Sequence, residues 1–249
     1  MTKQDILVAL TTYGSAPYID LSLTAYERQS SPCVIVVDDG SRSTALRDVC
    51  KKHRVPLLNT NSRPDASKTN GIGDVLSTCA AIRTAYALGY GYVVKQSRRW
   101  ICKDDPIPSL VDVFTKSDAA TAASYTTTYG FGFRTEFFAM RVKEWMTVVD
   151  EIEDTALNNP KKVGLVEAFI HKYAKSLEPN SEQYNAYKKE LNLPPSKAGY
   201  ALWNFVGTDK KNPPSNIIWH DRDNTTVYAN YAKELGLLYT VADFNKVNK

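Results

Sequence analysis

Polar residues stand at three points where a short apolar run ends, and their types suit ligand binding. They are Thr11–Tyr13, Asp38–Ser41 and Gln96–Arg99. A carboxylate at such a point can accept hydrogen bonds from the N–H groups of a nucleic base or from ribose hydroxyls. The alternative for Asp38 or Asp39 is local, with the carboxylate capping the turn that follows. The residue types therefore indicate a binding site and leave open which aspartate serves it.

The runs that precede these residues predict strands. Ile6–Leu10, Cys33–Val37 and Tyr92–Val94 are short and continuously apolar, which is typical of strands buried on both faces. Helical patterns alternate with them; Val75, Cys79, Ile82 and Tyr86 keep the spacing of an amphipathic helix. The βαβαβ alternation over residues 1–100 predicts a parallel sheet with helices on both faces. Ligands bind such sheets at the carboxyl ends of the strands, so the three polar groups are expected to meet.

The second half predicts further helices and strands without a linker or an internal repeat. We expect helices near Leu110–Phe114, around Glu144–Glu153, from Val166 to Tyr173 and from Tyr228 to Leu235, and strands at Ala119–Tyr125 and Phe133–Arg141. No composition shift marks a domain boundary, so a single α/β domain over residues 1–249 is the prediction.

Composition and charge narrow the class of protein. The chain has 249 residues, 43% of them hydrophobic and 23% charged, which is typical of a globular protein. A net charge of +4 does not predict a nucleic-acid binder, but it suits an anionic phosphate ligand or loose contact with an anionic membrane surface. Four scattered cysteines without metal or redox spacing favour reduced thiols. With no signal-peptide pattern and no membrane span, we expect a cytoplasmic protein.

The string Val36–Val37–Asp38–Asp39–Gly40–Ser41, after a first strand that ends in Thr–Thr–Tyr, resembles the nucleotide-binding half of family 2 GT-A glycosyltransferases. The resemblance implies one GT-A domain with a Rossmann-like, mixed and mostly parallel sheet. Residues 1–100 would form its nucleotide-binding half and residues 101–249 its acceptor-binding half. It also implies that Thr11, Tyr13 and Asp39 hold the nucleoside, with Asp38 beside them.

The chain departs from that family at the end of its Tyr92–Val94 strand. There the family has an Asp-x-Asp element that binds a divalent cation, and this chain has Ser97, Arg98 and Arg99. Guanidinium groups cannot bind Mg²⁺ or Mn²⁺, but they can neutralise a diphosphate through bidentate hydrogen bonds. Our hypothesis is that one or both arginines replace the metal, which makes a metal cofactor doubtful. The alternatives are that they pair with structural carboxylates or that the protein is inactive.

Sugar transfer with inversion needs a base, and the resemblance places an acidic residue at the head of a helix in the second half. Glu167 is the nearest match, although the family's Glu-Asp pair is absent and Glu167 could instead form a solvated pair with His171. Glu136 could reach an acceptor from a sheet end. His220 could help bind the diphosphate, as a C-terminal histidine does in related enzymes, or could be purely structural. Only 3 histidines occur, without paired ligand spacing, so a zinc site is not expected.

These features predict an enzyme that moves a sugar from a nucleotide-sugar donor to a glycan or lipid-linked acceptor. The resemblance implies inversion and a role in surface polysaccharide or lipopolysaccharide synthesis at the inner face of the membrane. A dinucleotide-dependent oxidoreductase would need a Gly-x-Gly-x-x-Gly motif after the first strand, and a sugar-nucleotide pyrophosphorylase a Gly-rich basic loop there; Thr11–Gly14 is neither. A non-catalytic relative that binds a nucleotide or glycan remains the alternative.

Overall fold

The computed structural model describes Thr2 and residues 5–29, 32–41, 43–60, 71–125, 133–190, 200–203, 216–219 and 224–246. Strands and helices alternate in its first half, as β1 (Ile6–Thr12), α1 (Ala16–Arg28), β2 (Cys33–Asp38), α2 (Thr44–Lys52), β3 (Leu57–Asn59), α3 (Ile72–Ala87), β4 (Tyr92–Ser97) and β5 (Trp100–Cys102). The second half continues with α4 (Ile107–Lys116), β6 (Thr121–Tyr125), β7 (Phe133–Arg141), α5 (Val142–Met146), α6 (Val149–Asn158), the 3-10 helix η2 (Pro160–Lys162), α7 (Val166–Ser176), α8 (Glu182–Glu190), β8 (Ala201–Leu202), β9 (Ile217–Trp219), α9 (Thr225–Glu234) and α10 (Val241–Lys246).

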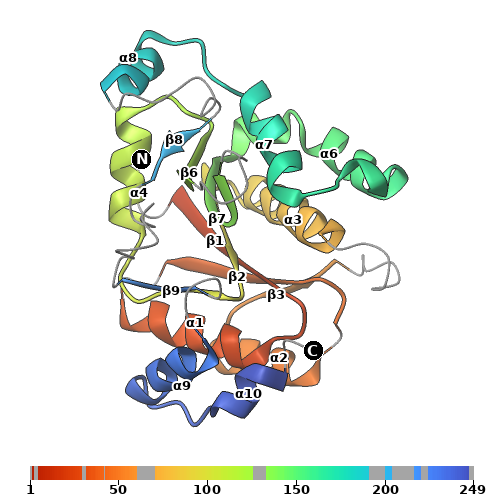
Figure 1. Ribbon diagram of the computed structural model, residues 1–249, viewed down its shortest axis with the longest axis vertical. Helices are drawn as coiled ribbons and strands as arrows, with labels where there is room; N and C mark the ends of the chain where they lie inside the picture. The colour runs from red at the N-terminus through yellow and green to blue at the C-terminus, as the bar shows by residue number, and fades with distance from the viewer. Residues whose placement is uncertain are drawn as a thin grey trace.

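A central sheet runs through the molecule, and its described strands follow the order β3-β2-β1-β4-β7-β6-β8 (Figure 1). Strands β1 to β4 are mutually parallel, β7 is antiparallel to both of its neighbours, and β8 is parallel to β6. Thr11 pairs with Ser97 and Thr12 with Asp38, so β1, β2 and β4 end at the same level. The mixed, mostly parallel sheet confirms the predicted fold class.

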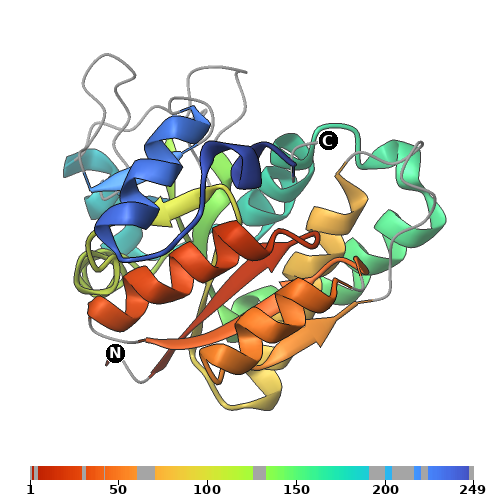
Figure 2. The same ribbon diagram turned by 90° about the horizontal axis from the view of Figure 1, so that it is seen from below.

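Helices cover both faces of the sheet, which the continuous apolar strands require. Helices α3, α5, α6 and α7 pack on one face and α1, α2 and α4 on the other (Figures 1 and 2). The strand residues alternate between the two cores: Leu7 and Ala9 face the first, whereas Val8 and Leu10 face the second. The start of α2 is fixed by Ser43, whose hydroxyl accepts a hydrogen bond from the Leu46 N–H at 3.2 Å.

The structure corrects two details of the second half. The expected helix around Glu144–Glu153 is divided into α5 and α6 at Thr147–Val148, where the Thr147 hydroxyl donates to the Glu144 carbonyl oxygen instead of continuing the helix. A small second sheet, which the sequence analysis did not anticipate, pairs β5 with β9 in antiparallel register. It brings a segment near the C-terminus alongside the residues that follow β4.

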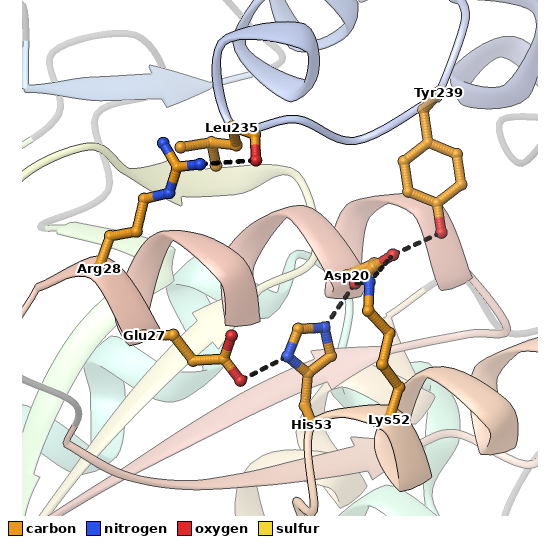
Figure 3. A network of polar contacts seen from close by, with 7 residues as sticks. All are labelled: Asp20, Glu27, Arg28, Lys52, His53, Leu235 and Tyr239. Atoms are coloured by element: carbon orange, nitrogen blue, oxygen red, sulfur yellow. Dashed lines mark hydrogen bonds and ion pairs between the residues drawn. The ribbon is translucent and has the colours of Figure 1, made fainter.

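The C-terminal helices α9 and α10 pack on α1 (Figure 2). Buried Asp20 of α1 stabilises this region: it accepts hydrogen bonds from Lys52 at 2.9 Å, from His53 at 2.5 Å and from the Tyr239 hydroxyl at 2.8 Å (Figure 3). Burial alone would raise the pKa of Asp20, but these three donors outweigh it and lower that pKa to about 2. The second ring nitrogen of His53 lies 2.7 Å from a Glu27 carboxylate oxygen.

The cysteines are free, with Cys50, Cys79 and Cys102 buried and Cys33 exposed. Burial raises the pKa of the Cys79 thiol to about 12 and that of Cys50 to about 11, so neither is a ready thiolate. None of the helices in the described ranges has the length and apolar character needed to cross a bilayer.

Candidate active site

A pocket of about 360 Å³ opens at the carboxyl ends of β1 and β4. Its walls come from five places: the end of β1, the residue after β2, the turn after β4, the start of α3, and β7 with the start of α7. It lies where ligands bind in parallel α/β sheets. Seven residues predicted to form the site line it, namely Thr11, Tyr13, Asp39, Ser97, Arg98, Arg99 and Glu167.

The two aspartates after β2 have different environments. Asp39 lines the pocket, and its N–H donates to the Thr12 carbonyl oxygen at 2.8 Å. Asp38 is not among the residues that line the pocket; its carboxylate accepts hydrogen bonds from the Gly14 N–H at 3.1 Å and from the Ser41 N–H and hydroxyl at 3.0 and 2.8 Å. Asp38 therefore joins the loops after β1 and β2, and Asp39 presents its carboxylate beside the pocket.

The start of helix α3 forms a wall of the pocket that the sequence analysis did not assign. Gly71 has φ of +102° at the N-cap and lies against Val166, while Gly73 lies directly under the Asp39 carboxylate. A Cβ on Gly73 would be 1.6 Å from Asp39 Oδ2, so only glycine permits this approach. The signal in the sequence was the Gly–Ile–Gly at the head of a long helix. The unpaired N–H groups of a helix N-terminus favour an anionic group nearby.

The turn after β4 holds both arginines at the pocket through backbone contacts. The Arg98 N–H donates to the Thr11 carbonyl oxygen at 2.9 Å, and the Tyr228 hydroxyl donates to the Arg99 carbonyl oxygen at 2.5 Å. The buried Gln96 side chain donates to the Trp100 carbonyl oxygen at 2.7 Å across the same turn. The Arg98 guanidinium also donates to the Ser15 hydroxyl. The turn is thus preorganised, and part of its support comes from α9.

The resemblance to GT-A glycosyltransferases implies a divalent cation at this strand end, but the residues do not fit one. A hydroxyl and two guanidinium groups occupy the position of the acidic motif, and guanidinium nitrogens are donors without a lone pair for a metal. Within the described ranges, no three or more His, Cys, Asp or Glu side chains gather in a way that could hold a metal ion. Metal independence remains a prediction.

The side of the pocket opposite the arginines carries acidic residues, which surround one buried lysine. Lys95, fully buried, forms an ion pair with Asp74 at 2.7 Å and donates to the Thr135 carbonyl oxygen at 2.6 Å. It thereby ties β4 to the start of α3 and to β7. The next residue of β7, Glu136, also lines the pocket.

Glu167 lies in the first turn of α7 and faces this acidic side. Burial raises the pKa of Glu167 above its ordinary value, and the negative charges of Glu136 and Asp74 raise it further. His171 is buried and packs edge-on against Tyr200, with ring centroids 5.8 Å apart, so it does not lie on the solvated surface that the alternative required. A half-buried carboxylate with a raised pKa in a pocket is suited to proton transfer.

His220 falls outside the described residues, so its predicted contact with the diphosphate stays a prediction.

Comparisons with known proteins identify the fold. No protein-family model matches the sequence, and no curated protein matches it. Among solved structures, the glycosyltransferase GlyE of Streptococcus pneumoniae is 13% identical with a TM-score of 0.52, over 96% of this chain and 62% of that one. The galactosyltransferase LgtC is 11% identical with a TM-score of 0.51, over 94% of this chain and 97% of that one. The chain has the GT-A fold.

A third similar structure is the glucosyl-3-phosphoglycerate synthase of Mycobacterium tuberculosis, at 12% identity and a TM-score of 0.44, over 64% of this chain. The chain spans 62% of the length of GlyE and 66% of the length of that synthase, which is less than two thirds of each. Identities this low establish the fold alone, and membership in glycosyltransferase family 2 remains a prediction from the sequence.

Proposed function

We propose that the protein is a glycosyltransferase that moves a sugar from a nucleotide-sugar donor to a hydroxyl group of an acceptor. The observation that carries the proposal is the pocket at the carboxyl ends of β1 and β4, where two arginines, a helix N-terminus and a carboxylate with a raised pKa meet in a GT-A fold. The arginines suit a diphosphate, and the carboxylate suits the removal of a proton.

The donor would lie across the parallel half of the sheet. The aromatic ring of Tyr13, which is 40% exposed at the pocket, offers a face for the base, and Asp39 accepts hydrogen bonds from ribose hydroxyls. Arg98 and Arg99 would bind the diphosphate, beside the N-terminus of α3. This arrangement leaves the sugar between the arginine turn and the acidic side of the pocket.

Transfer would then proceed by inversion. The acceptor hydroxyl oxygen attacks the anomeric carbon, the bond from that carbon to the diphosphate oxygen breaks, and the hydroxyl proton passes to the Glu167 carboxylate. The arginines stabilise the negative charge that develops on the departing diphosphate. A pKa raised above the ordinary glutamate value makes the ionised Glu167 carboxylate a stronger base.

The finer parts of the proposal follow from the resemblance and from charge. We take the acceptor to be a glycan or lipid-linked sugar, used in surface polysaccharide or lipopolysaccharide synthesis at the inner face of the membrane. The net charge of +4 supports peripheral contact with anionic lipid. The sheet draws β1 to β4 from the first half and β6 to β8 from the second, which supports one domain over residues 1–249.

Calorimetric titration with the diphosphates of uridine, guanosine, thymidine and cytidine, each with EDTA and with Mn²⁺, tests the proposal. We expect one nucleotide to bind, with an affinity that EDTA leaves unchanged, and its sugar ester to be hydrolysed or transferred. Binding without hydrolysis or transfer would support the non-catalytic relative. Failure of all four to bind would refute the proposal.

A further inference from the structure

Glu136 of β7 has a carboxylate oxygen with no function in the fold. The pairing of β4 with β7 ends at Gln96 and Phe137, and one further step of that register sets Glu136 beside Ser97. Its side chain lines the pocket and is 19% exposed. Its Oε2 atom is buried and accepts no hydrogen bond within the described parts of the chain. An unsatisfied carboxylate oxygen is costly unless a ligand supplies a donor.

The charges around Glu136 determine which donor is suitable. Lys95 is occupied by Asp74 and by the Thr135 carbonyl oxygen, so its charge is largely balanced at the pocket. Arg134 lies 3.6 Å from the other carboxylate oxygen, Oε1, but it is buried and packs over the Trp219 ring instead of lining the pocket. On the pocket side, Glu136 is accompanied by Glu167, which is also negative when it acts as a base.

The ligand group beside these carboxylates must therefore donate hydrogen bonds and carry no negative charge. A sugar hydroxyl can satisfy Glu136 Oε2, whereas a ligand carboxylate offers no proton and adds a like charge in a half-enclosed site. The arginine turn on the opposite wall attracts the diphosphate, so the charge pattern orients the donor with its sugar toward Glu136.

We propose that Glu136 is a specificity-determining residue that binds a hydroxyl of the transferred sugar and restricts the donor to neutral hexoses, against uronic acids. This inference rests on the proposed function, since it assumes a nucleotide-sugar donor. It adds the chemical class of the sugar and the residue that selects it.

The test compares a nucleotide hexose with the uronate that differs only by a carboxylate at C6. The pair used carries the nucleotide that binds: the glucose and glucuronate esters of uridine, thymidine or cytidine diphosphate, or the mannose and mannuronate esters of guanosine diphosphate. Calorimetry with the full chain should show the hexose ester binding about tenfold more tightly than the uronate. In Glu136→Gln, which removes the charge and keeps the shape, this ratio should fall to about threefold or less, with the affinity for the nucleoside diphosphate unchanged. Glu190→Gln is the control variant: it removes one negative charge from an exposed residue of α8, and it should keep the full ratio.

The outcomes separate the two proposals. If the nucleoside diphosphate binds and the unaltered protein takes both esters equally, the inference about Glu136 is wrong and the proposed function stands. If no nucleotide binds, both proposals fail. If Glu136→Gln weakens both esters and the free diphosphate to the same extent, Glu136 has a structural role and the inference fails. Should that variant not fold, the ratio measured on the unaltered protein decides.

Discussion

Replacing Gly73 with alanine should move the carboxylate of Asp39. The added Cβ would lie 1.6 Å from Asp39 Oδ2 and 2.4 Å from its Cγ, far inside any permitted contact. The Asp39 backbone is held by its hydrogen bond to Thr12, so the displacement must come from the side chain. The variant therefore tests Asp39 as the nucleoside contact while that residue is still present.

The size of the effect follows from the bonds that are lost. Hydrogen bonds to a charged group contribute about 1.5–3 kcal/mol, so the nucleoside diphosphate should bind roughly tenfold to a hundredfold more weakly. Stability should change little. Alanine is favoured over glycine in a helix by up to about 1 kcal/mol, and this offsets a similar cost of displacing a flexible carboxylate.

Calorimetry measures the nucleotide affinity of each variant, and a thermal melt measures its stability. Gly91→Ala is the matched control, because its Cβ would meet only the Asp5 carbonyl oxygen at 4.0 Å. Asp39→Asn should reproduce the loss of affinity without any steric conflict. If Gly73→Ala bound the nucleotide as tightly as the unaltered protein, Asp39 would not contact the nucleoside and the assignment would be refuted.

Three further results are expected. Arg98→Ala and Arg99→Ala should each weaken nucleoside diphosphate binding by about tenfold or more, and Mn²⁺ should not restore it. Glu167→Gln should lower transfer by about 10²–10⁴-fold with nucleotide binding retained, and transfer by the unaltered protein should fall as pH drops through a pKa above 4.5. His53→Gln should lower the Tm by a few degrees at pH 6, and by less as the pH rises. Burial disfavours the charged ring, but the carboxylates of Asp20 and Glu27 outweigh it and raise the pKa of His53, so its stabilisation is present below its unfolded pKa of 6.5 and is lost as pH rises through the folded value.

Each of these results has a control and a contrary outcome. Arg83→Ala removes an arginine from a half-exposed ion pair on α3 and should leave nucleotide binding intact; equal losses in all three arginine variants would indicate a general charge effect. Full transfer by Glu167→Gln would exclude Glu167 as the base. A Tm difference for His53→Gln that is the same at pH 6 and at pH 9 would show that the imidazole charge does not stabilise the fold.

The sequence by itself determined the sheet and the meeting of its strand ends. Continuous apolar runs can be buried on both faces only inside a sheet covered by helices, and βαβ connections make the first strands parallel. Their carboxyl ends must then lie together, so Thr11–Tyr13, Asp38–Ser41 and Gln96–Arg99 could be assigned to one site from their places after the runs. Glu167 was found through the family resemblance, which placed an acidic residue at the head of that helix.

Tertiary structure alone decided which of two side chains adjacent in sequence lines the pocket. Adjacent residues such as Asp38 and Asp39 have the same local pattern, and only the contacts made by the loops after β1 and β2 distinguish them. The pairing of Lys95 with Asp74 and the unsatisfied oxygen of Glu136 depend on how β4, α3 and β7 pack against one another. The spacing of apolar residues along a chain shows which positions are buried and whether they repeat with the period of a strand or of a helix. The direction of a side chain at the end of an element is instead set by contacts between segments far apart in sequence.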